Sequence, residues 1–402
     1  MKSALKILFA AVLILSAGTS GAKDLRRVSP GAEDTTAYFH LIRNKRIAIV
    51  ANQTSLLGGK YLVDSLLHSG FSIKRIFAPE HGFRGEAGAG DHVKDGVDVA
   101  TGINIVSIYG KHMKPTAEDL EGIDVVIFDI QDVGVRFFTY ISTLQYVMEA
   151  CAENHIRLIV LDRPNPNGYY IDGPVLDRKY ASFIGMQPVP VVYGMTMGEY
   201  ALMLNGEKWL AKKVKCQLKV IPNRLYTHSS RPVLQVRPSP NLPDMDAIYL
   251  YPSVCFFEGT RVSLGRGTSY PFRLIGYPGM KDGDTSFTPR EIPGVATNPP
   301  YEDTLCQGAK LINYGYTIRE KGGIHLEWLI RMYKNYPDKS NFFTSFFKSL
   351  AGNDELRIQI EQGKSEEEIK ASWKSSIDQF KVIRKKYLLY DDFSSDTQKK
   401  SK

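Results

Sequence analysis

Glu80 is the residue of this sequence whose surroundings best fit acid–base chemistry. It follows Pro79 at the end of an apolar run, with His81 and Arg84 close behind it. A carboxyl group that is half-buried at the edge of a cleft is partly desolvated, which favours its neutral form and suits it to act as a general acid. A nearby arginine favours the ionised form instead. The alternative interpretation is a structural ion pair between Glu80 and an arginine.

Four further segments resemble the Glu80 segment, because each places polar or conformationally special residues directly after an apolar run. They are residues 52–54, 109–111, 129–136 and 162–166. Each has a structural alternative, such as helix capping by Asn52 or a local ion pair between Asp162 and Arg163. These segments add Asp129 as a catalytic candidate. As candidates for substrate binding, beside His81 and Arg84, they add Asn52, Gln131, Asp132, Arg136, Asp162, Arg163 and Asn165, and Tyr140, which closely follows residues 129–136, is a further candidate.

A second group of candidates lies further along the chain, in segments rich in proline and glycine. Asn241 belongs to residues 237–243, while Glu258 and Arg266 are flanked by glycines that allow the backbone to approach a ligand closely. Glu258 is the candidate for a second carboxylate. Aromatic residues in the same stretch suit stacking on a sugar ring, although packing in a core is the alternative.

The elements that must position these residues alternate between β-rich runs and helical patterns. The continuous valine and isoleucine of the runs is typical of strands that are covered on both faces. The pattern predicts a Rossmann-like α/β domain with a mostly parallel sheet. The expected strands are residues 46–51, 73–78, 104–107, 124–129, 157–161 and 189–192, and the expected helices are residues 61–68, 115–120 and 137–154.

The strand ends of such a sheet share one edge, where open α/β proteins bind their ligands. We therefore expect Glu80, Asp129, Arg136 and Asp162 to surround a common pocket. Five successive strands each end in polar or conformationally special residues, and five independent structural explanations for this pattern are difficult to accept. The cluster predicts a binding site without naming its reaction.

The chain is too long for one ordinary core, and its second half predicts a smaller mixed α+β domain. Residues 222–300 have the composition of long ordered loops around short strands. Helical patterns return at residues 324–335, 341–350, 354–361 and 372–386. The predicted organisation is a signal peptide at 1–22, the Rossmann-like domain at 23–230, the C-terminal domain with cleft loops at 231–393 and a disordered tail at 394–402.

The first residues have the pattern of an export signal. Lys2 and Lys6 precede an apolar run at residues 7–17, and small residues follow at 20–22. The run is too short to anchor the protein across a bilayer. We expect an exported chain, periplasmic or secreted, with no stable membrane insertion after the signal is removed.

Charge and cysteine content exclude several classes of partner. The net charge of +8 falls to +6 without Lys2 and Lys6, and the basic residues are scattered. This mildly favours an anionic surface such as a cell wall and argues against a nucleic-acid partner. The four cysteines, at positions 151, 216, 255 and 306, form no CxxC pair, which argues against structural zinc.

Three segments partly resemble known functional motifs but do not match them in spacing or residue type. Residues 85–90 are glycine-rich but lack the order of a dinucleotide-binding loop. Residues 194–198 imitate a nucleophile elbow with threonine in place of serine, and we prefer a capping box formed by Thr196 and Glu199. His81, Glu86 and His92 do not have the helical spacing of zinc ligands. We therefore predict neither a cofactor nor a metal.

Taken together, the unusual segments resemble the exo-β-N-acetylmuramidases, glycoside hydrolase family 171, formerly a domain of unknown function. The resemblance extends from about residue 41 to the C-terminal region. The segments that carry it are residues 78–85, 128–137, 161–166 and 257–260.

The resemblance implies a cleft between two domains and the release of N-acetylmuramic acid from the non-reducing end of peptidoglycan fragments, as in cell-wall turnover, without a nucleotide cofactor. It places the family's proposed catalytic glutamate at Glu80. Glycosidases commonly use two carboxylates, so Glu258, Asp129 or Asp132 is the expected partner. The lactyl carboxylate of muramic acid requires a cation, for which the candidates are Arg84, Arg136, Arg163 and Arg266.

Two other functions use the same residues. The first is a metal-dependent hydrolase with His81, Asp129 and Asp162 as ligands. The second is a protein that binds muropeptides in the cleft without cleaving them.

Overall fold

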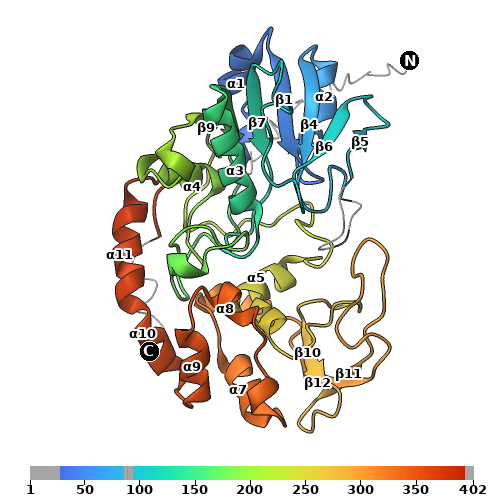
Figure 1. The fold of residues 1–402 in the computed structure, drawn as a ribbon, viewed down its shortest axis with the longest axis vertical. Coiled ribbons are helices and arrows are strands. Elements are labelled where there is room, and N and C mark those ends of the chain that lie inside the picture. Colours follow the sequence, from blue (N-terminus) through green and yellow to red (C-terminus); the bar gives the residue numbers. More distant parts are fainter. Residues whose placement is uncertain (1–27, 86–87, 89–93, 394–402) are drawn as a thin grey trace, which may run out of the picture.

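The computed structural model describes residues 28–85, 88 and 94–393, and Figure 1 shows a sheet region above a C-terminal region. The predicted signal peptide and the predicted tail lie outside the described residues, as do Glu86 and His92. Within the described part of the chain, no helix is long and apolar enough to cross a membrane.

A seven-stranded sheet forms the centre of the first region. All neighbouring strands run parallel, except that the first strand in sheet order is antiparallel to the second. The predicted mostly parallel sheet is therefore confirmed. In sheet order the strands are β5 (Gly96–Val97), β6 (Asn104–Ser107), β4 (Ser72–Ala78), β1 (Arg46–Ala51), β7 (Val125–Asp129), β8 (Arg157–Leu161) and β9 (Gln217–Ile221).

Helices cover both faces of the sheet. Successive side chains of a strand point to opposite faces, so Ile49 belongs to one apolar cluster and Val50 to another. The Ile49 cluster includes side chains of the helices at residues 35–42 and 62–68. The Val50 cluster includes side chains of the helices at residues 140–153 and 197–206. The helices are α1 (Thr35–Ile42), α2 (Leu62–His68), α3 (Tyr140–Glu153) and α4 (Met197–Gly206), and a small hairpin of β2 (Leu56–Leu57) and β3 (Lys60–Tyr61) precedes α2.

The start of α4 confirms the predicted capping box. The side chain of Thr196 accepts a hydrogen bond from the backbone N–H of Glu199, and the Glu199 carboxylate accepts one from the backbone of Thr196. These bonds satisfy backbone groups that the first helical turn leaves without partners. Thr196 is thus a structural residue.

Two predicted elements of this region are wrong. Residues 189–192 are buried, but they form only isolated bridges through Val192, and the sixth parallel strand is β9 instead. The β9 strand lies at the sheet edge with alternating burial, so its sequence lacks the continuous apolar run that we searched for. Residues 115–120 form turns, because the segment is too short to propagate a helix.

The C-terminal region joins a small antiparallel sheet to a set of short helices. The predicted helical patterns are confirmed with shorter bounds, whereas residues 222–300 contain a buried helix in addition to loops. The strands are β10 (Leu274–Tyr277), β12 (Cys306–Lys310) and β11 (Thr285–Phe287), in sheet order. The helices are α5 (Met245–Val254), α6 (Tyr314–Lys321), α7 (Glu327–Asn335), α8 (Phe347–Ala351), α9 (Glu355–Glu361), α10 (Glu366–Ser372) and α11 (Lys374–Lys385).

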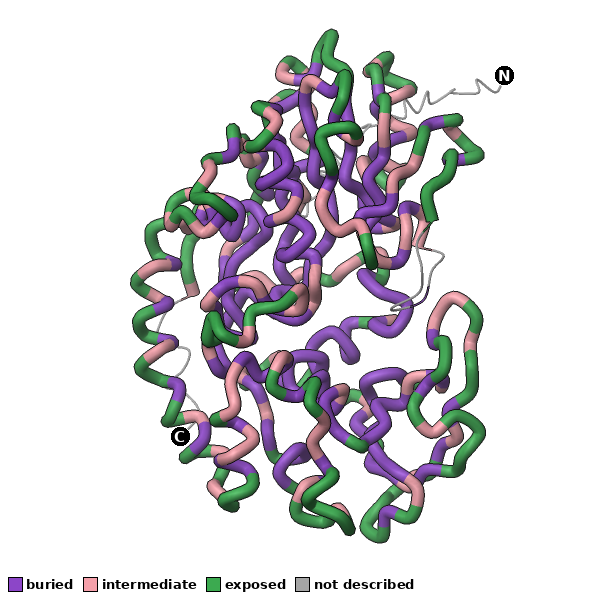
Figure 2. The backbone as a smooth tube through the Cα atoms, viewed as in Figure 1, coloured by how far each residue is buried: buried purple, intermediate pink, exposed green. Residues whose placement is uncertain are grey.

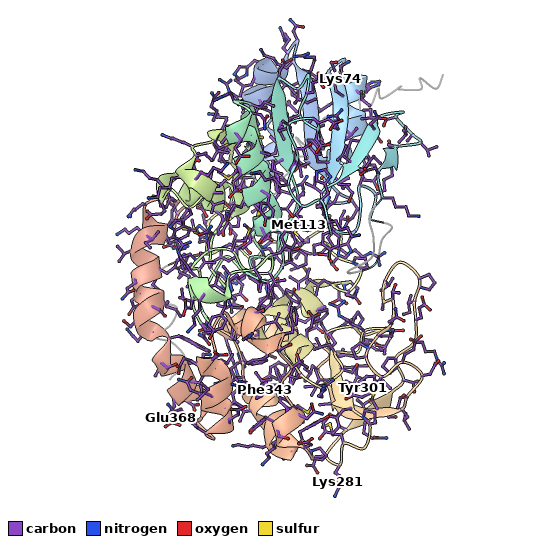
Figure 3. The ribbon with its side chains drawn as sticks, in the orientation of Figure 1. Lys74, Met113, Lys281, Tyr301, Phe343 and Glu368 are labelled. Carbon is purple, nitrogen blue, oxygen red and sulfur yellow. The ribbon has the colours of Figure 1, made fainter. Side chains whose placement is uncertain are left out.

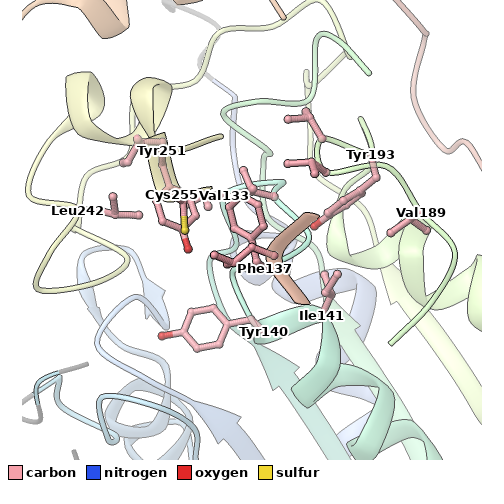
Figure 4. Close-up of a cluster of buried hydrophobic side chains, with 14 of the residues drawn as sticks. Val133, Phe137, Tyr140, Ile141, Val189, Tyr193, Leu242, Tyr251 and Cys255 are labelled. Atoms are coloured by element: carbon pink, nitrogen blue, oxygen red, sulfur yellow. The ribbon is translucent and has the colours of Figure 1, made fainter. Parts of the chain in front are cut away.

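One apolar core continues from the sheet region into the C-terminal region, as the buried backbone in Figure 2 illustrates. Phe137 packs edge-on against Tyr251 of α5, with ring centroids 5.5 Å apart, and Figure 4 shows both rings in one cluster. The four cysteines are buried as free thiols, and Cys151 packs in this core. The two regions are thus packed as one body.

Candidate functional site

A cavity of about 390 Å³ lies between the sheet region and the C-terminal region. Both regions contribute to its wall, which contains charged, amide and aromatic side chains. Of the candidates chosen from sequence, the cavity is lined by Glu80, His81, Tyr140, Asn241, Glu258 and Arg266.

Glu80 reaches the cavity because it stands two residues beyond the end of β4. Its Oε1 accepts a hydrogen bond from the hydroxyl of Tyr109 at 2.9 Å, and its Oε2 lies 3.3 Å from the hydroxyl of Thr139. Tyr109 follows β6, the parallel neighbour of β4, and Thr139 precedes α3. Three segments of the sheet edge therefore fix the orientation of one carboxyl group.

The backbone turns sharply after Glu80. His81 is buried and has a φ of 73°, in the left-handed region that few residues other than glycine adopt. The N–H of Gly82 closes the turn by donating to the carbonyl of Pro79 at 3.0 Å. Such strained residues cluster at functional sites, and this one places His81 beside Glu80 in the cavity wall.

Tyr140 connects the cavity to the sheet. Its hydroxyl accepts a hydrogen bond from the side-chain amide of Asn52 at 3.0 Å, and burial raises the pKa of Tyr140. The amide oxygen of Asn52 accepts two hydrogen bonds from Thr54. Asn52 does not line the cavity and supports Tyr140 from behind.

Glu258 and Arg266 form an ion pair in the wall of the C-terminal region. Both Nε and Nη2 of Arg266 donate to Oε1 of Glu258, with the Nε contact at 3.1 Å. Both side chains are about one-quarter exposed, and the guanidinium carbon lies 4.9 Å from the centre of the Phe272 ring. The cavity therefore holds two carboxylates, Glu80 and Glu258, and one arginine.

Aromatic rings and the loop at residues 295–300 complete the wall. Phe138 and Tyr251 pack edge-on, with centroids 5.8 Å apart, and both line the cavity. The side-chain amide of Asn241 donates to the carbonyl of Val295 at 2.7 Å, which fixes the loop at residues 295–300 against the cavity. Such rings suit the apolar face of a sugar.

The expectation that Glu80, Asp129, Arg136 and Asp162 share one pocket is wrong, because only Glu80 lines the cavity. Asp129 is fully buried and accepts two hydrogen bonds from Arg163, at 2.6 and 2.9 Å. Asp162 is buried behind the sheet edge, where it accepts hydrogen bonds from Tyr390 at 2.5 Å and from the backbone of Gly198. Burial raises the pKa of Asp162 to about 6.

Arg136 likewise has a structural environment. Its Nη1 donates to the carbonyls of Pro174 and Val189, and its Nη2 donates to those of Leu350 and Ala351, all within 2.9 Å. Its guanidinium is completely buried without a carboxylate, and desolvation lowers the pKa of Arg136 to about 9. Arg136 joins the two regions and does not contact the cavity.

The side chains of the remaining candidates also form hydrogen bonds or ion pairs with neighbouring groups of the protein. Asp132 is buried, and its Oδ2 accepts from Tyr193 and from Gly134, while burial raises the pKa of Asp132 to about 7. Arg84 pairs with Asp98, with a closest distance of 2.7 Å. Elsewhere, the Gln131 side chain donates to the carbonyls of Asp132 and Pro164, and that of Asn165 to the carbonyl of Met195.

Sequence reasoning missed several residues of the cavity. Tyr109 and Thr139 lie within or beside segments that we singled out, so their positions after a strand and before a helix were usable signals. Phe183, Phe346 and residues 295–300 lie in segments with no local motif. Only the tertiary structure brings them to Glu80.

The ligands suggested for a metal-dependent hydrolase do not converge. His81 lines the cavity, whereas Asp129 is paired with Arg163 and Asp162 with Tyr390. Among residues 28–85, 88 and 94–393, no group of three or more histidine, cysteine, aspartate and glutamate side chains could hold a metal ion.

Comparison with known proteins identifies relatives over nearly the whole chain. The family model described as "Exo-beta-N-acetylmuramidase NamZ, N-terminal" matches residues 47–246, and its C-terminal counterpart matches residues 249–390. "Peptidoglycan beta-N-acetylmuramidase NamZ" of Bacillus subtilis (strain 168) is 40% identical over 371 residues, which is 88% of this chain and 89% of the relative.

Two crystal structures of DUF1343 family proteins from Bacteroides fragilis NCTC 9343 share the fold. One is 50% identical to this chain with a TM-score of 0.85, and the other is 28% identical with a TM-score of 0.77. Each comparison covers 91% of this chain and 99% of the other chain.

Proposed function

Because the chain belongs to the exo-β-N-acetylmuramidase NamZ family, it is a glycoside hydrolase, and we propose that Glu80 is the general acid of its reaction. The reaction is the release of N-acetylmuramic acid from the non-reducing end of peptidoglycan fragments, with bond cleavage at the cavity. The supporting observation is that Glu80 and Glu258 line one cavity of about 390 Å³.

Glu80 would protonate the oxygen that leaves the cleaved glycosidic bond. Hydroxyl groups of Tyr109 and Thr139 contact its two carboxyl oxygens, so its orientation toward the cavity is fixed before substrate binds. A preorganised group loses little conformational entropy when the transition state forms. Together with its place in the cavity wall, this supports the acid role for Glu80 over the buried Asp129, Asp132 and Asp162, which do not line the cavity.

Glu258 is the second carboxylate in our proposal, in place of Asp129. The guanidinium of Arg163 occupies both oxygens of Asp129 deep in the core, whereas the contacts of Arg266 converge on Oε1 of Glu258. We propose that Oε2 of Glu258 either activates the attacking water as a general base or attacks the anomeric carbon of the sugar as a nucleophile. Glycosidases require such a partner for the acid on the other side of the bond.

Arg266 is the cation that we assign to the lactyl carboxylate of the substrate. Of the four arginines considered from sequence, it is the one that lines the cavity. Its Nε and Nη2 donate to Glu258, so the substrate carboxylate would bind at Nη1, and the guanidinium carbon lies 4.9 Å from the centre of the Phe272 ring. The neighbouring aromatic rings would then hold the apolar face of the sugar.

Replacement of Glu80 tests the acid role. Glu80→Gln should lower kcat on a natural muramic acid disaccharide by roughly 10²- to 10⁴-fold, the usual contribution of a general acid. The loss should be smaller on a nitrophenyl glycoside, whose leaving group needs little protonation. Glu121→Gln, at an exposed position, is the matched control. Near-normal cleavage of the disaccharide, or equal losses on both substrates, would remove Glu80 from the acid role.

We also propose that the chain acts outside the cytoplasm, in the periplasm or as a secreted enzyme. The apolar run at residues 7–17 behind Lys2 and Lys6 supports export. Cell fractionation of the full-length chain and of a variant lacking residues 2–22 tests this. Equal cytoplasmic retention of both chains would contradict it.

A further inference from the structure

A second cavity, of about 500 Å³, opens beside the C-terminal helices. It lies between residues 169–172 and helices α10 and α11, and it shares no lining residue with the cavity of Glu80. In Figure 3, Glu368 of α10 and Tyr301, next to the loop at 295–300, are on opposite sides of the C-terminal region. The second cavity is therefore separate from the reaction site.

Aromatic side chains form the inner wall of this second cavity. Tyr169, Tyr170 and Trp373 line it and are at most 6% exposed. The indole N–H of Trp373 donates to Oδ1 of Asp172 at 3.1 Å, which fixes the ring. Gly322 and Gly323, with φ of 69° and 88°, add a stretch of wall without side chains. Rigid aromatic rings beside bare backbone suit the apolar C–H face of a pyranose ring.

The second cavity also carries an excess of positive charge. Its lining contains five lysine and arginine side chains and three carboxylates. The guanidinium of Arg231 lies 3.5 Å from the centre of the Tyr169 ring, and its Nη1 donates to the carbonyl of Ser229 at 2.8 Å. In the described part of the chain, Lys370, Lys374 and Lys381 form ion pairs with carboxylates, whereas Arg231 and Lys321 form none. Glu320 lines the same cavity and acts on Arg231 electrostatically without forming an ion pair with it, so this half-buried cation favours an anionic ligand.

We propose that the second cavity binds a carboxylate-bearing segment of a peptidoglycan glycan strand, away from the point of cleavage. The carboxylate would lie on Arg231 and Lys321, and a sugar ring would lie against Trp373 and Tyr170. The inference rests on the proposed function, because lactyl carboxylates on pyranose rings are the chemistry of that substrate. Such a site keeps the enzyme on an insoluble polymer between cleavage events by raising its effective concentration there.

Co-sedimentation with peptide-free glycan strands, which keep their lactyl carboxylates, tests the site in the full chain. The double variant Arg231→Gln, Lys321→Gln should bind the strands about tenfold more weakly, the effect of losing charge-assisted hydrogen bonds. Its kcat and KM on a nitrophenyl muramic acid glycoside should be unchanged, because cleavage of this small substrate in the Glu80 cavity does not require the enzyme to be held on a polymer. Lys334→Gln, at an exposed position of α7 outside the second cavity, is the control.

Undiminished binding of glycan strands by the double variant would overturn the inference. So would an equal loss of binding to chitin, which has no carboxylate, or a parallel loss of activity on the small glycoside. Arg231→Lys, which keeps the charge but not the planar fork, should bind with intermediate affinity and shows that the fold tolerates substitution. Failure of the proposed function would be distinct, because the wild-type chain would then not cleave the small glycoside.

Discussion

The hydroxyl of Tyr109 donates a 2.9 Å hydrogen bond to Oε1 of Glu80. The two residues follow β6 and β4, which are parallel neighbours in the sheet, so the register of the strands sets this contact. The sheet therefore orients the carboxyl group of Glu80 as well as carrying it to the cavity.

Removal of this hydroxyl should slow the reaction without weakening substrate binding. We expect Tyr109→Phe to lower kcat on the natural disaccharide about tenfold, the upper net value of one ordinary hydrogen bond, with KM changed less than twofold. Phenylalanine retains the ring contact with Phe183. Tyr146→Phe, whose ring stacks on the same Phe183, is the matched control. A rise in KM with kcat unchanged would contradict a positioning role for Tyr109.

Substitution of Arg266 should remove selectivity for the free lactyl acid. Wild-type enzyme should bind the muramic acid product at least about tenfold more tightly than its methyl ester, because the ester cannot accept two charge-assisted hydrogen bonds. Arg266→Gln should lose this preference, and Arg266→Lys should retain part of it. Calorimetric titration with both ligands measures the difference, and Arg261→Gln, an exposed neighbour, is the control. A preference that persists in Arg266→Gln would reject the assignment.

Asp132 should make the protein less stable as the pH rises. Burial raises its pKa to about 7, so the native state keeps a proton that the unfolded chain releases near pH 4. Its contribution is present below the unfolded pKa and is lost as the pH rises through the folded pKa, by on the order of 4 kcal/mol. Asp132→Asn should therefore be more stable than wild type at pH 8, but not at pH 4, in urea unfolding.

Asp124 provides the control of opposite sign. Its ion pair with Arg46 lowers the pKa of Asp124 to about 2. That contribution is present above the unfolded pKa and is lost as the pH falls through about 2. Asp124→Asn should thus gain nothing at pH 8. If Asp132→Asn shows the same pH dependence as wild type, Asp132 does not titrate as inferred.

Arg136 should contribute strongly to stability and not to chemistry. Arg136→Met keeps much of the side-chain volume but removes donors from four buried carbonyls, so the free energy of unfolding should fall by about 3 kcal/mol. Arg357→Met, whose side chain is 42% exposed in an ion pair with Glu361, should change it by less than about 0.5 kcal/mol. Urea unfolding of both variants measures the contrast. Equal effects would show that burial of Arg136 carries no special stabilisation.

The sheet could be predicted because the sequences of its central strands are continuous apolar runs. β1, β4, β7 and β8 were found within a residue or two. β9 was missed because an edge strand with one exposed face has no such run. The position of Glu80 followed from the same reasoning, since it directly follows β4.

Which of the other strand-end candidates line the cavity could not be predicted, because a polar residue at a strand end can face a ligand or be buried against a partner inside the protein. Asp129 and Asp162 lie at the carboxyl ends of parallel strands, where ligand-binding residues are common. Inside the protein, however, Asp129 pairs with Arg163 and Asp162 accepts a hydrogen bond from Tyr390. Buried polar groups must find hydrogen-bond partners, and Tyr390 lies 228 positions away from Asp162 along the chain. Local sequence does not record such long-range pairing.

The four carbonyls held by Arg136 come from both regions of the protein, two from each. A hinge-bending closure over the substrate would separate these carbonyls from a guanidinium that has nowhere else to donate. These bonds therefore oppose such a closure, and we expect the two walls of the cavity to keep their relative position when substrate binds. A preformed cavity of this kind admits a single chain end without a hinge motion.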